Sequence, residues 1–285
     1  MKCDLVKSGG RVQCSRCRRG WLGIIEAERE CHPIEVACRD EKKQRPTQSG
    51  AKRVSTVSLS FEPLELPLRE SDRVVVTLAI GERFQELLEI SRATFVDYAA
   101  KCQADYREIL LDSSDYPEGD KFRISQLFDI GYREVLFVDA DALIMPDAEN
   151  LFEISPDADV CIHDDAPHLK YREWLDNEYR GLIESQGWDV ETQTCYNTGL
   201  MLIRDRRAVE MPVLPFPRSH TAEQSLINLQ IARHGLKVHR LDRKWNEQWW
   251  FNNALSPRPE TYVYHWANAP HATRLKEMPN FLTIC

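Results

Sequence analysis

The fold is decided by the stretch Val135-Leu-Phe-Val-Asp-Ala-Asp-Ala-Leu-Ile144, an apolar run that delivers two carboxylates, Asp139 and Asp141. Four bulky apolar residues in succession predict a buried strand of an α/β sheet. Ligands of such sheets bind beyond the carboxyl ends of the strands, where these carboxylates stand. Side chains two apart on a strand point the same way, so the pair repels unless a cation lies between them. Mg²⁺ or Mn²⁺ holding a diphosphate is the first hypothesis, although acidic pairs also form plain turns at strand ends.

Length and composition set the limits of the architecture. With 285 residues, 42% of them hydrophobic, the chain can bury one sizeable core and has room for a small appendage. No stretch has the length of an apolar membrane span, and the first residues lack the apolar segment of a secretory signal. We therefore expect a soluble, cytoplasmic protein that does not bind membranes. Its oligomeric state is not predicted.

The charge divides the chain into two parts. Residues 1–53 hold 13 Lys and Arg against 7 Asp and Glu, a net charge of +6, which leaves −14 for the remainder of the −8 total. Between them, polar residues and prolines from Asp40 to Pro67 predict a linker or an extended arm. We predict a Cys-rich module over residues 1–45, a linker over 46–70 and the main domain over 71–285.

The amino-terminal module has the spacing of a zinc site. Five of the nine cysteines fall in the first 38 residues, which suits metal binding better than disulfides. A unit this small has too little core to fold without help, and a structural Zn²⁺ would supply it. The predicted ligands are Cys14, Cys17, Cys31 and Cys38, with Cys3 or His32 as possible substitutes. Cys102, Cys161, Cys195 and Cys285 are predicted to be ordinary thiols.

Two roles for this module remain open. It could only stabilise the protein, or it could dock an acceptor that carries phosphates, because basic residues and an aromatic side chain surround the Cys-x-x-Cys motif. These residues are Arg11, Arg16, Arg18, Arg19 and Trp21.

Strands and helices alternate along the main domain, as in an α/β fold. Asn197-Thr-Gly199 marks a place where the backbone approaches a ligand closely. Thr221 and Gln224 have the spacing of a capping box at the start of a helix. The predicted strands are 73–80, 109–111, 135–138, 159–162, 196–203 and 261–266, and the predicted helices are 82–100, 122–129 and 221–232.

Taken together, these motifs resemble the glycogenin-like family of retaining, metal-dependent glycosyltransferases. The match spans Arg73 to about Lys276 and excludes the Cys-rich module. The resemblance implies a GT-A fold, a Rossmann-like mixed sheet flanked by helices, and transfer of a hexose from a UDP-sugar to an acceptor hydroxyl. The motifs that carry it, in order, are Thr77-Leu-Ala79, Lys121-Phe-Arg-Ile-Ser-Gln-Leu-Phe128, Leu136–Ile144, Asn150-Leu-Phe-Glu-Ile154, Cys195-Tyr-Asn-Thr-Gly-Leu-Met201, Glu223-Gln-Ser-Leu-Ile-Asn228 and His265.

The resemblance also implies roles for single residues. Asp139, Asp141 and His265 would bind Mn²⁺, or Mg²⁺, which bridges both phosphates of the donor. Phe84 would stack on the uracil base. The other residues implied in the nucleotide-sugar site are Thr77, Ala79, Ala140, Lys121, Asn197, Thr198, Glu223 and Gln224.

Two departures from the family bear on the chemistry. Glu223 replaces the usual Asp, which puts the identity of the sugar in doubt. The family's lysine after the metal histidine is missing, so His271, Arg274 or Lys276 must supply a cation from the C-terminal loop.

The catalytic carboxylate is left open. The side-chain oxygen of Gln224, or a carboxylate such as Asp164 or Asp165, could face the positive charge that develops at the anomeric carbon, and Glu223 is a candidate nucleophile. Lys121 completes this predicted catalytic set.

Three hypotheses for the acceptor compete. The family default is a saccharide or a small molecule. Alternatively, the basic module steers the acidic domain onto a nucleic acid with hydroxylated bases. In the third, the protein binds a nucleotide sugar or a partner without catalysis.

Overall fold

The structure is a computed structural model in which the chain forms two compact units, Met1–Ser55 and Thr56–Cys285. The first unit contains a three-stranded antiparallel sheet of β1 (Leu5–Ser8), β2 (Arg11–Cys14) and β3 (Gly20–Trp21). Cys14 ends β2, whereas the other predicted zinc ligands lie outside the described residues. The structure describes residues 5–8, 11–14, 20–21, 63–64, 67–112, 117–169, 172–212, 219 and 221–283.

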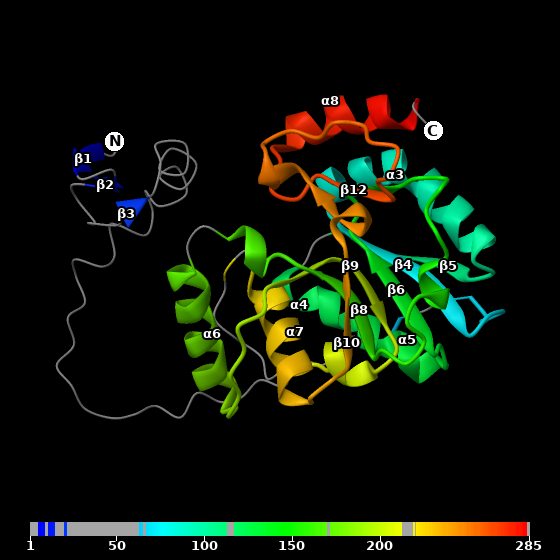
Figure 1. Cartoon of the computed structure of the whole chain (residues 1–285), viewed down its shortest axis with the longest axis horizontal. Helices are drawn as coiled ribbons and strands as arrows, with labels where there is room; N and C mark the ends of the chain where they lie inside the picture. Colours follow the sequence, from blue (N-terminus) through cyan, green and yellow to red (C-terminus); the bar gives the residue numbers. More distant parts are fainter. Residues whose placement is uncertain are drawn as a thin grey trace. The chain divides into compact units, whose positions relative to one another are not determined.

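The second unit is built on a six-stranded mixed sheet, which confirms the predicted α/β class (Figure 1). Its strand order is β10-β8-β9-β6-β4-β5, and β9 runs antiparallel to both of its neighbours while the other pairs are parallel. The strands are β4 (Arg73–Ile80), β5 (Asp105–Leu111), β6 (Glu134–Val138), β8 (Val160–Asp164), β9 (Tyr196–Ile203) and β10 (Val238–Leu241).

A small second sheet continues from the end of β6. Its order is β11-β12-β7, and β7 pairs antiparallel with β12 so that Ala142 lies opposite His265. Since β7 begins directly after Asp141, this pairing carries His265 to the two carboxylates. The strands are β7 (Ala142–Ile144), β11 (Glu247–Gln248) and β12 (Val263–His265).

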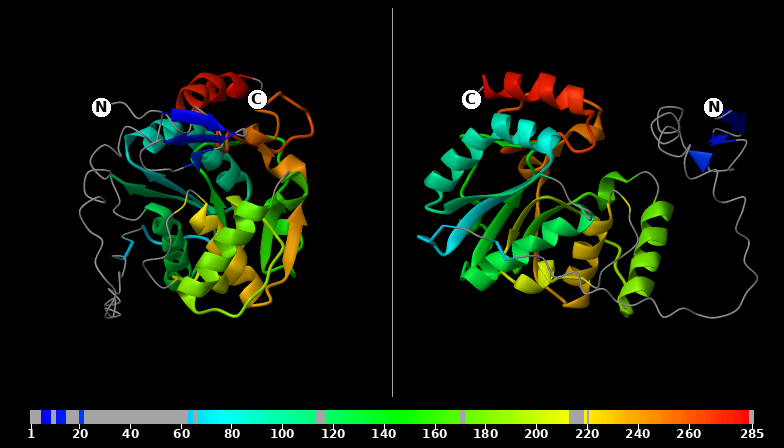
Figure 2. Two further views of the ribbon diagram at one scale, coloured as in Figure 1. Left: turned by 90° about the vertical axis from the view of Figure 1, so that its left-hand side faces the viewer. Right: turned by 180° about the vertical axis from the view of Figure 1, so that it is seen from behind.

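Helices cover both faces of the large sheet (Figures 1 and 2). On one face, α3 (Glu82–Lys101) packs on Val75 and Ala79, and α8 (His271–Leu282) packs on α3. On the other, α5 (Ser125–Ile130) and α7 (Ala222–Arg233) pack on the alternate side chains of the same strands, and α6 (Glu173–Gln186) packs on α7. This period of two gives the inner strands β4, β6, β8 and β9 two buried faces. None of the helices in the described ranges is both long and apolar enough to span a membrane.

The predicted elements differ from the structure in several places, and strands β7, β10 and β11 were not predicted. β5 begins at Asp105 rather than residue 109, because charged residues are tolerated on this edge strand. The helix predicted over 122–129 is a 3₁₀ turn, Lys121–Ile124, followed by α5. Helix α6 was not predicted, and the stretch expected to be a C-terminal loop is helix α8.

Among the described cysteines, Cys102, Cys161 and Cys195 are buried free thiols, as predicted. Burial raises the pKa of Cys195 to about 12, so this thiol stays protonated at neutral pH. Cys285 lies outside the described residues.

Candidate active site

A cavity of about 730 Å³ lies beyond the carboxyl ends of β4 and β6. Its wall combines the end of β4, the turn after β6, the start of β9, the first turn of α7 and the segment between β12 and α8. Most of the predicted donor-site residues meet here. They are Phe84, Lys121, Asp139, Ala140, Asp141, Asn197, Thr198, Glu223, Gln224, His265 and Arg274.

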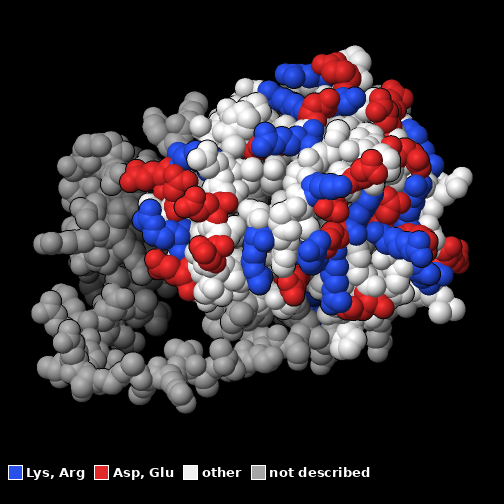
Figure 3. Space-filling model, turned by 60° about the horizontal axis from the view of Figure 1, so that its bottom comes forward, with Lys and Arg blue, Asp and Glu red and all other residues white. Residues whose placement is uncertain are grey.

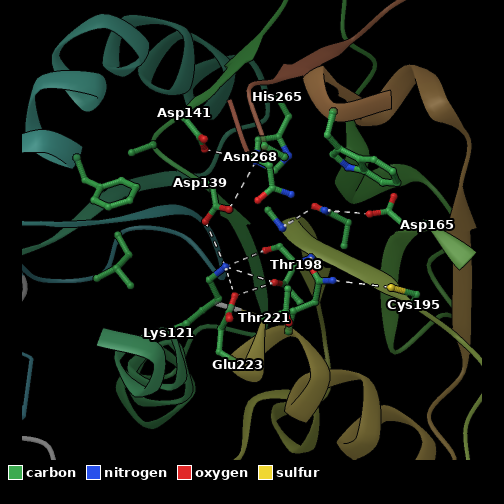
Figure 4. Close-up of a pocket in the computed structure, with 18 of the residues that line it drawn as sticks. Lys121, Asp139, Asp141, Asp165, Cys195, Thr198, Thr221, Glu223, His265 and Asn268 are labelled. Atoms are coloured by element: carbon green, nitrogen blue, oxygen red, sulfur yellow. Dashed lines mark hydrogen bonds and ion pairs between the residues drawn. The ribbon is translucent and has the colours of Figure 1, made fainter. Parts of the chain in front are cut away.

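The predicted metal ligands converge at one point of this cavity (Figure 4). One ligand atom from each of Asp139, Asp141 and His265 lies within 4.8 Å of the other two. The His265 Nε2 atom is 3.4 Å from an Asp141 oxygen and 3.7 Å from an Asp139 oxygen. Asp141 and His265 are buried, so their polar atoms need partners inside the protein. The donor set of two carboxylates and one imidazole suits a divalent cation.

Gly199 on β9 makes the space for this cluster. A Cβ at this position would lie 2.1 Å from His265 Cε1 and 2.9 Å from Asp139 Oδ2, closer than real Cβ contacts. The Gly199 carbonyl also accepts a hydrogen bond from the Asp139 N–H at 2.8 Å. Side chains of the same protein therefore approach the backbone closely at Gly199, and the approach of a ligand to Asn197–Gly199 stays a prediction.

Asn246 orients the imidazole of His265. Its Nδ2 donates to the Asn197 side-chain oxygen at 3.0 Å, and its Oδ1 is 3.0 Å from His265 Nδ1. Because the amide nitrogen of Asn246 is already used as a donor, its oxygen must accept, so Nδ1 of the imidazole carries the proton. Nε2 is left as a lone pair directed at the two carboxylates, as a metal ligand requires.

Of the three predicted cations His271, Arg274 and Lys276, Arg274 lines this cavity. Its guanidinium lies 3.2 Å from an Asp141 oxygen and donates to the Trp266 carbonyl. Burial alone would raise the pKa of Asp141, but His265, when no metal is bound and its imidazole is protonated, and Arg274 outweigh burial and lower that pKa. Of the other two candidates, His271 contacts Glu86 and Lys276 is exposed, and neither lines the cavity.

Lys121 is buried at the cavity floor, as Figure 4 shows. Its Nζ lies 3.2 Å from Asp139 Oδ1 and 3.2 Å from Glu223 Oε1, and it donates to the Thr198 hydroxyl. Burial disfavours the charged amine, yet the two carboxylates outweigh this effect and raise the pKa of Lys121. The lysine therefore stays charged between the metal cluster and the start of α7.

The start of α7 presents Glu223 and Gln224 to the cavity. The Gln224 side-chain oxygen accepts weakly from the Thr198 N–H at 3.4 Å. The predicted capping box is wrong, since Thr221 makes no side-chain cap and instead donates to Glu178 of α6 at 2.8 Å. This contact ties α6 to the start of α7.

The two consecutive carboxylates after β8 have different roles. Asp164 does not line the cavity; it accepts from the N–H groups of Ala166 and Cys195 and stabilises the turn. Asp165 lines the cavity and accepts from Gln248 Nε2 at 2.7 Å and from Asn197 Nδ2 at 3.1 Å. Burial raises the pKa of Asp165 to about 7, although these two hydrogen bonds oppose the shift.

The residues of β4 that face the cavity are not the predicted ones. Leu78 and Ile80 line the cavity beside Phe84, whereas Thr77 and Ala79 are fully buried and do not. Residues on a strand alternate between its two faces, so an error of one position assigns residues of the core to the wall of the cavity. The apolar run along β4 is almost unbroken, so it does not reveal which alternate residues face the cavity. Asn246 and Gln248, which orient the site, carry no sequence motif at all.

Comparison with known proteins gives structural similarity alone. No known family profile matches the chain, and no curated protein does. A glycosyltransferase involved in the glycosylation of the major capsid of PBCV-1 is 13% identical over 72% of this chain and 98% of its own, with a TM-score of 0.47. Galactosyltransferase LgtC with donor and acceptor sugar analogs is 14% identical over 73% and 95%, with a TM-score of 0.42. Mouse xyloside xylosyltransferase 1 is 15% identical over 70% and 99%, with a TM-score of 0.41.

Proposed function

We propose that the unit Thr56–Cys285 is a GT-A glycosyltransferase that transfers a hexose from a UDP-sugar to an acceptor hydroxyl with retention. The observation that carries the proposal is the convergence of Asp139, Asp141 and His265 within 4.8 Å in a cavity that also holds Phe84 and Lys121. These ligands suit Mn²⁺ or Mg²⁺ and leave positions for phosphate oxygens. A bound divalent ion would neutralise charge on the departing diphosphate.

In this reaction the bond between the anomeric carbon and the diphosphate oxygen breaks, and its electron pair stays with the diphosphate. The acceptor oxygen forms the new bond on the same face of the sugar, and its proton passes to the diphosphate. We assign the binding of the diphosphate to Arg274, and the contact of its guanidinium with Asp141, one of the proposed metal ligands, supports this assignment. The Gln224 oxygen offers partial negative charge to the anomeric carbon.

Neither Glu223 nor Asp165, the two other carboxylates that line the cavity, suits the role of a covalent nucleophile. Glu223 already binds Lys121 and the Thr198 hydroxyl, an arrangement suited to gripping sugar hydroxyls. Asp165 has a pKa of about 7 and gives both oxygens to amide donors, so it carries less charge than an ordinary aspartate. We therefore propose that Gln224 lies beside the anomeric carbon. The sugar is then transferred directly, without a covalent intermediate.

A panel of UDP-sugars with Mn²⁺, assayed for release of UDP, tests this proposal. Asp141→Ala should lower metal-dependent turnover at least about a hundredfold, because the ligand set loses its buried carboxylate. The matched control is Asp147→Ala, an exposed carboxylate outside the cavity. Equal turnover of the wild type and Asp141→Ala would contradict the proposal. Binding of UDP without any turnover of a UDP-sugar would instead support the non-catalytic hypothesis.

For the amino-terminal unit we propose one structural Zn²⁺, held by Cys14, Cys17, Cys31 and Cys38 or by a set that includes Cys3 or His32. The spacing of these residues in the sequence supports it. Elemental analysis of protein purified without added metal should find about one zinc per chain.

A further inference from the structure

Two tryptophan side chains line the cavity in addition to Phe84. Trp250 borders it next to Asp165, since both are bound by the Gln248 side chain. Trp174, in the first turn of α6, borders the same cavity and keeps 42% of its surface exposed. Leu169 completes this apolar wall. No step assigned above uses these side chains.

The Trp250 indole and the helix that carries Trp174 are held in place without a ligand. The Trp250 indole N–H donates to Gln248 at 2.5 Å, and Gln248 is itself fully buried. Helix α6, which carries Trp174, is anchored by Glu178, whose carboxylate accepts from the hydroxyls of Thr221 and Ser225 on α7. Rigid aromatic faces bind flat or apolar surfaces at low entropic cost, because little side-chain freedom remains to be lost.

The charged side chains that line the cavity favour a neutral ligand. Among the described residues that line the cavity, Lys121 and Arg274 are the Lys and Arg side chains, and both contact the carboxylates of the metal cluster. Helix α6 carries four carboxylates and one guanidinium along its length. A nucleic acid needs unpaired cations for its phosphates. Figure 3 shows one face of this unit, on which basic and acidic side chains are interspersed rather than gathered into a basic stripe.

We propose that Trp174 and Trp250 form the acceptor subsite and that the acceptor is a neutral saccharide, whose ring packs its C–H face on an indole. This inference rests on the glycosyltransferase function proposed above. Sugar rings combine an apolar face with a polar rim, and the cavity offers the same combination, with the Trp250 indole beside Asp165 and Trp174 in the lining. The acceptor hydroxyl then reaches the anomeric carbon and takes part in the bond exchange described above.

The test measures UDP release by the full chain with Mn²⁺ and its preferred UDP-sugar, with and without acceptor. The acceptors are methyl β-glucoside, methyl β-galactoside, methyl β-xyloside and an oligonucleotide that contains 5-hydroxymethylcytosine. At least one glycoside should stimulate UDP release and gain the mass of one hexose. Trp174→Ala and Trp250→Ala should each lower kcat/KM for that glycoside at least about tenfold, and Trp174→Phe should retain most of it.

The donor reaction provides the internal control. KM for the UDP-sugar and its hydrolysis without acceptor should change less than about twofold in these variants. Leu110→Ala, which truncates a side chain that is 49% exposed outside the cavity, should match the wild type throughout. Stimulation by the oligonucleotide alone, by no acceptor, or equally in wild type and both alanine variants overturns the subsite. Absence of any UDP-sugar hydrolysis and of UDP binding would overturn the glycosyltransferase function itself.

Discussion

Carboxylates line two parts of one cavity, and their surroundings give them opposite properties. In one part, Asp139 and Asp141 face the lone pair of His265 and the cations Lys121 and Arg274. In the other part, Asp165 receives hydrogen bonds from two neutral amides, and burial raises its pKa to about 7. The first cluster holds negative charge that a cation can bind. At Asp165, burial favours the protonated, neutral carboxyl group. The environment rather than the residue type therefore decides the chemistry.

The strongest test of this contrast removes the space in which the metal cluster forms. Gly199→Ala would place a Cβ 2.1 Å from His265 Cε1, so the imidazole must move away from the carboxylates. We expect the affinity for Mn²⁺, measured by calorimetry in the presence of UDP, to fall at least about a hundredfold, with some loss of stability from overpacking.

The matched control is Gly181→Ala on α6, where an added Cβ meets nothing within 4 Å. It should bind Mn²⁺ like the wild type. Wild-type affinity in Gly199→Ala, with a circular dichroism spectrum that shows a folded protein, would mean that His265 is not a ligand.

A smaller effect is expected from the residue that orients His265. Asn246→Leu keeps the volume but removes the acceptor for the Nδ1 proton, so the affinity for Mn²⁺ should fall about 10- to 100-fold. Asn246→Asp keeps that acceptor and should retain more affinity than the leucine variant. A role in packing alone predicts the reverse, an unchanged affinity in Asn246→Leu, and calorimetric titration of both variants distinguishes the two.

The last prediction concerns the stability of the protein rather than its affinity for metal, and its subject is Asp165. The folded protein keeps the Asp165 proton up to about pH 7, whereas the unfolded chain loses it near 3.8. Stability from this group is therefore fully present below pH 3.8 and is lost as the pH rises to about 7, by roughly 4 kcal/mol in total.

Urea unfolding without metal, at intervals from pH 4 to pH 8, measures this loss. Asp165→Asn removes the titrating group, so the stability difference between wild type and variant should decrease with pH and level off above about pH 7. A difference that is independent of pH would show that Asp165 is ionised in the folded state throughout.

The parts of the fold that could be predicted are those with a strong local pattern. The buried strand β6 and the helix α3 have long apolar periods, and both lie where the sequence predicts them. Helix α6 was missed although Leu175, Tyr179 and Leu182 follow a helical spacing, because its charged residues resemble a surface loop. The residues of β4 predicted to face the cavity were wrong by one position, since an unbroken apolar strand does not reveal which of its faces meets a ligand.

The sequence by itself determined what is local: the buried strand before Asp139 and Asp141, their shared side, and the start of the helix that carries Gln224. Only the tertiary structure decided which distant residues join them. The pairing of β7 with β12 brings His265 to the carboxylates, and α8 presents Arg274 rather than its neighbours. The physical reason is that the backbone period and apolar burial are encoded within a few residues, whereas strand register and the space left by Gly199 arise only when separate elements pack together.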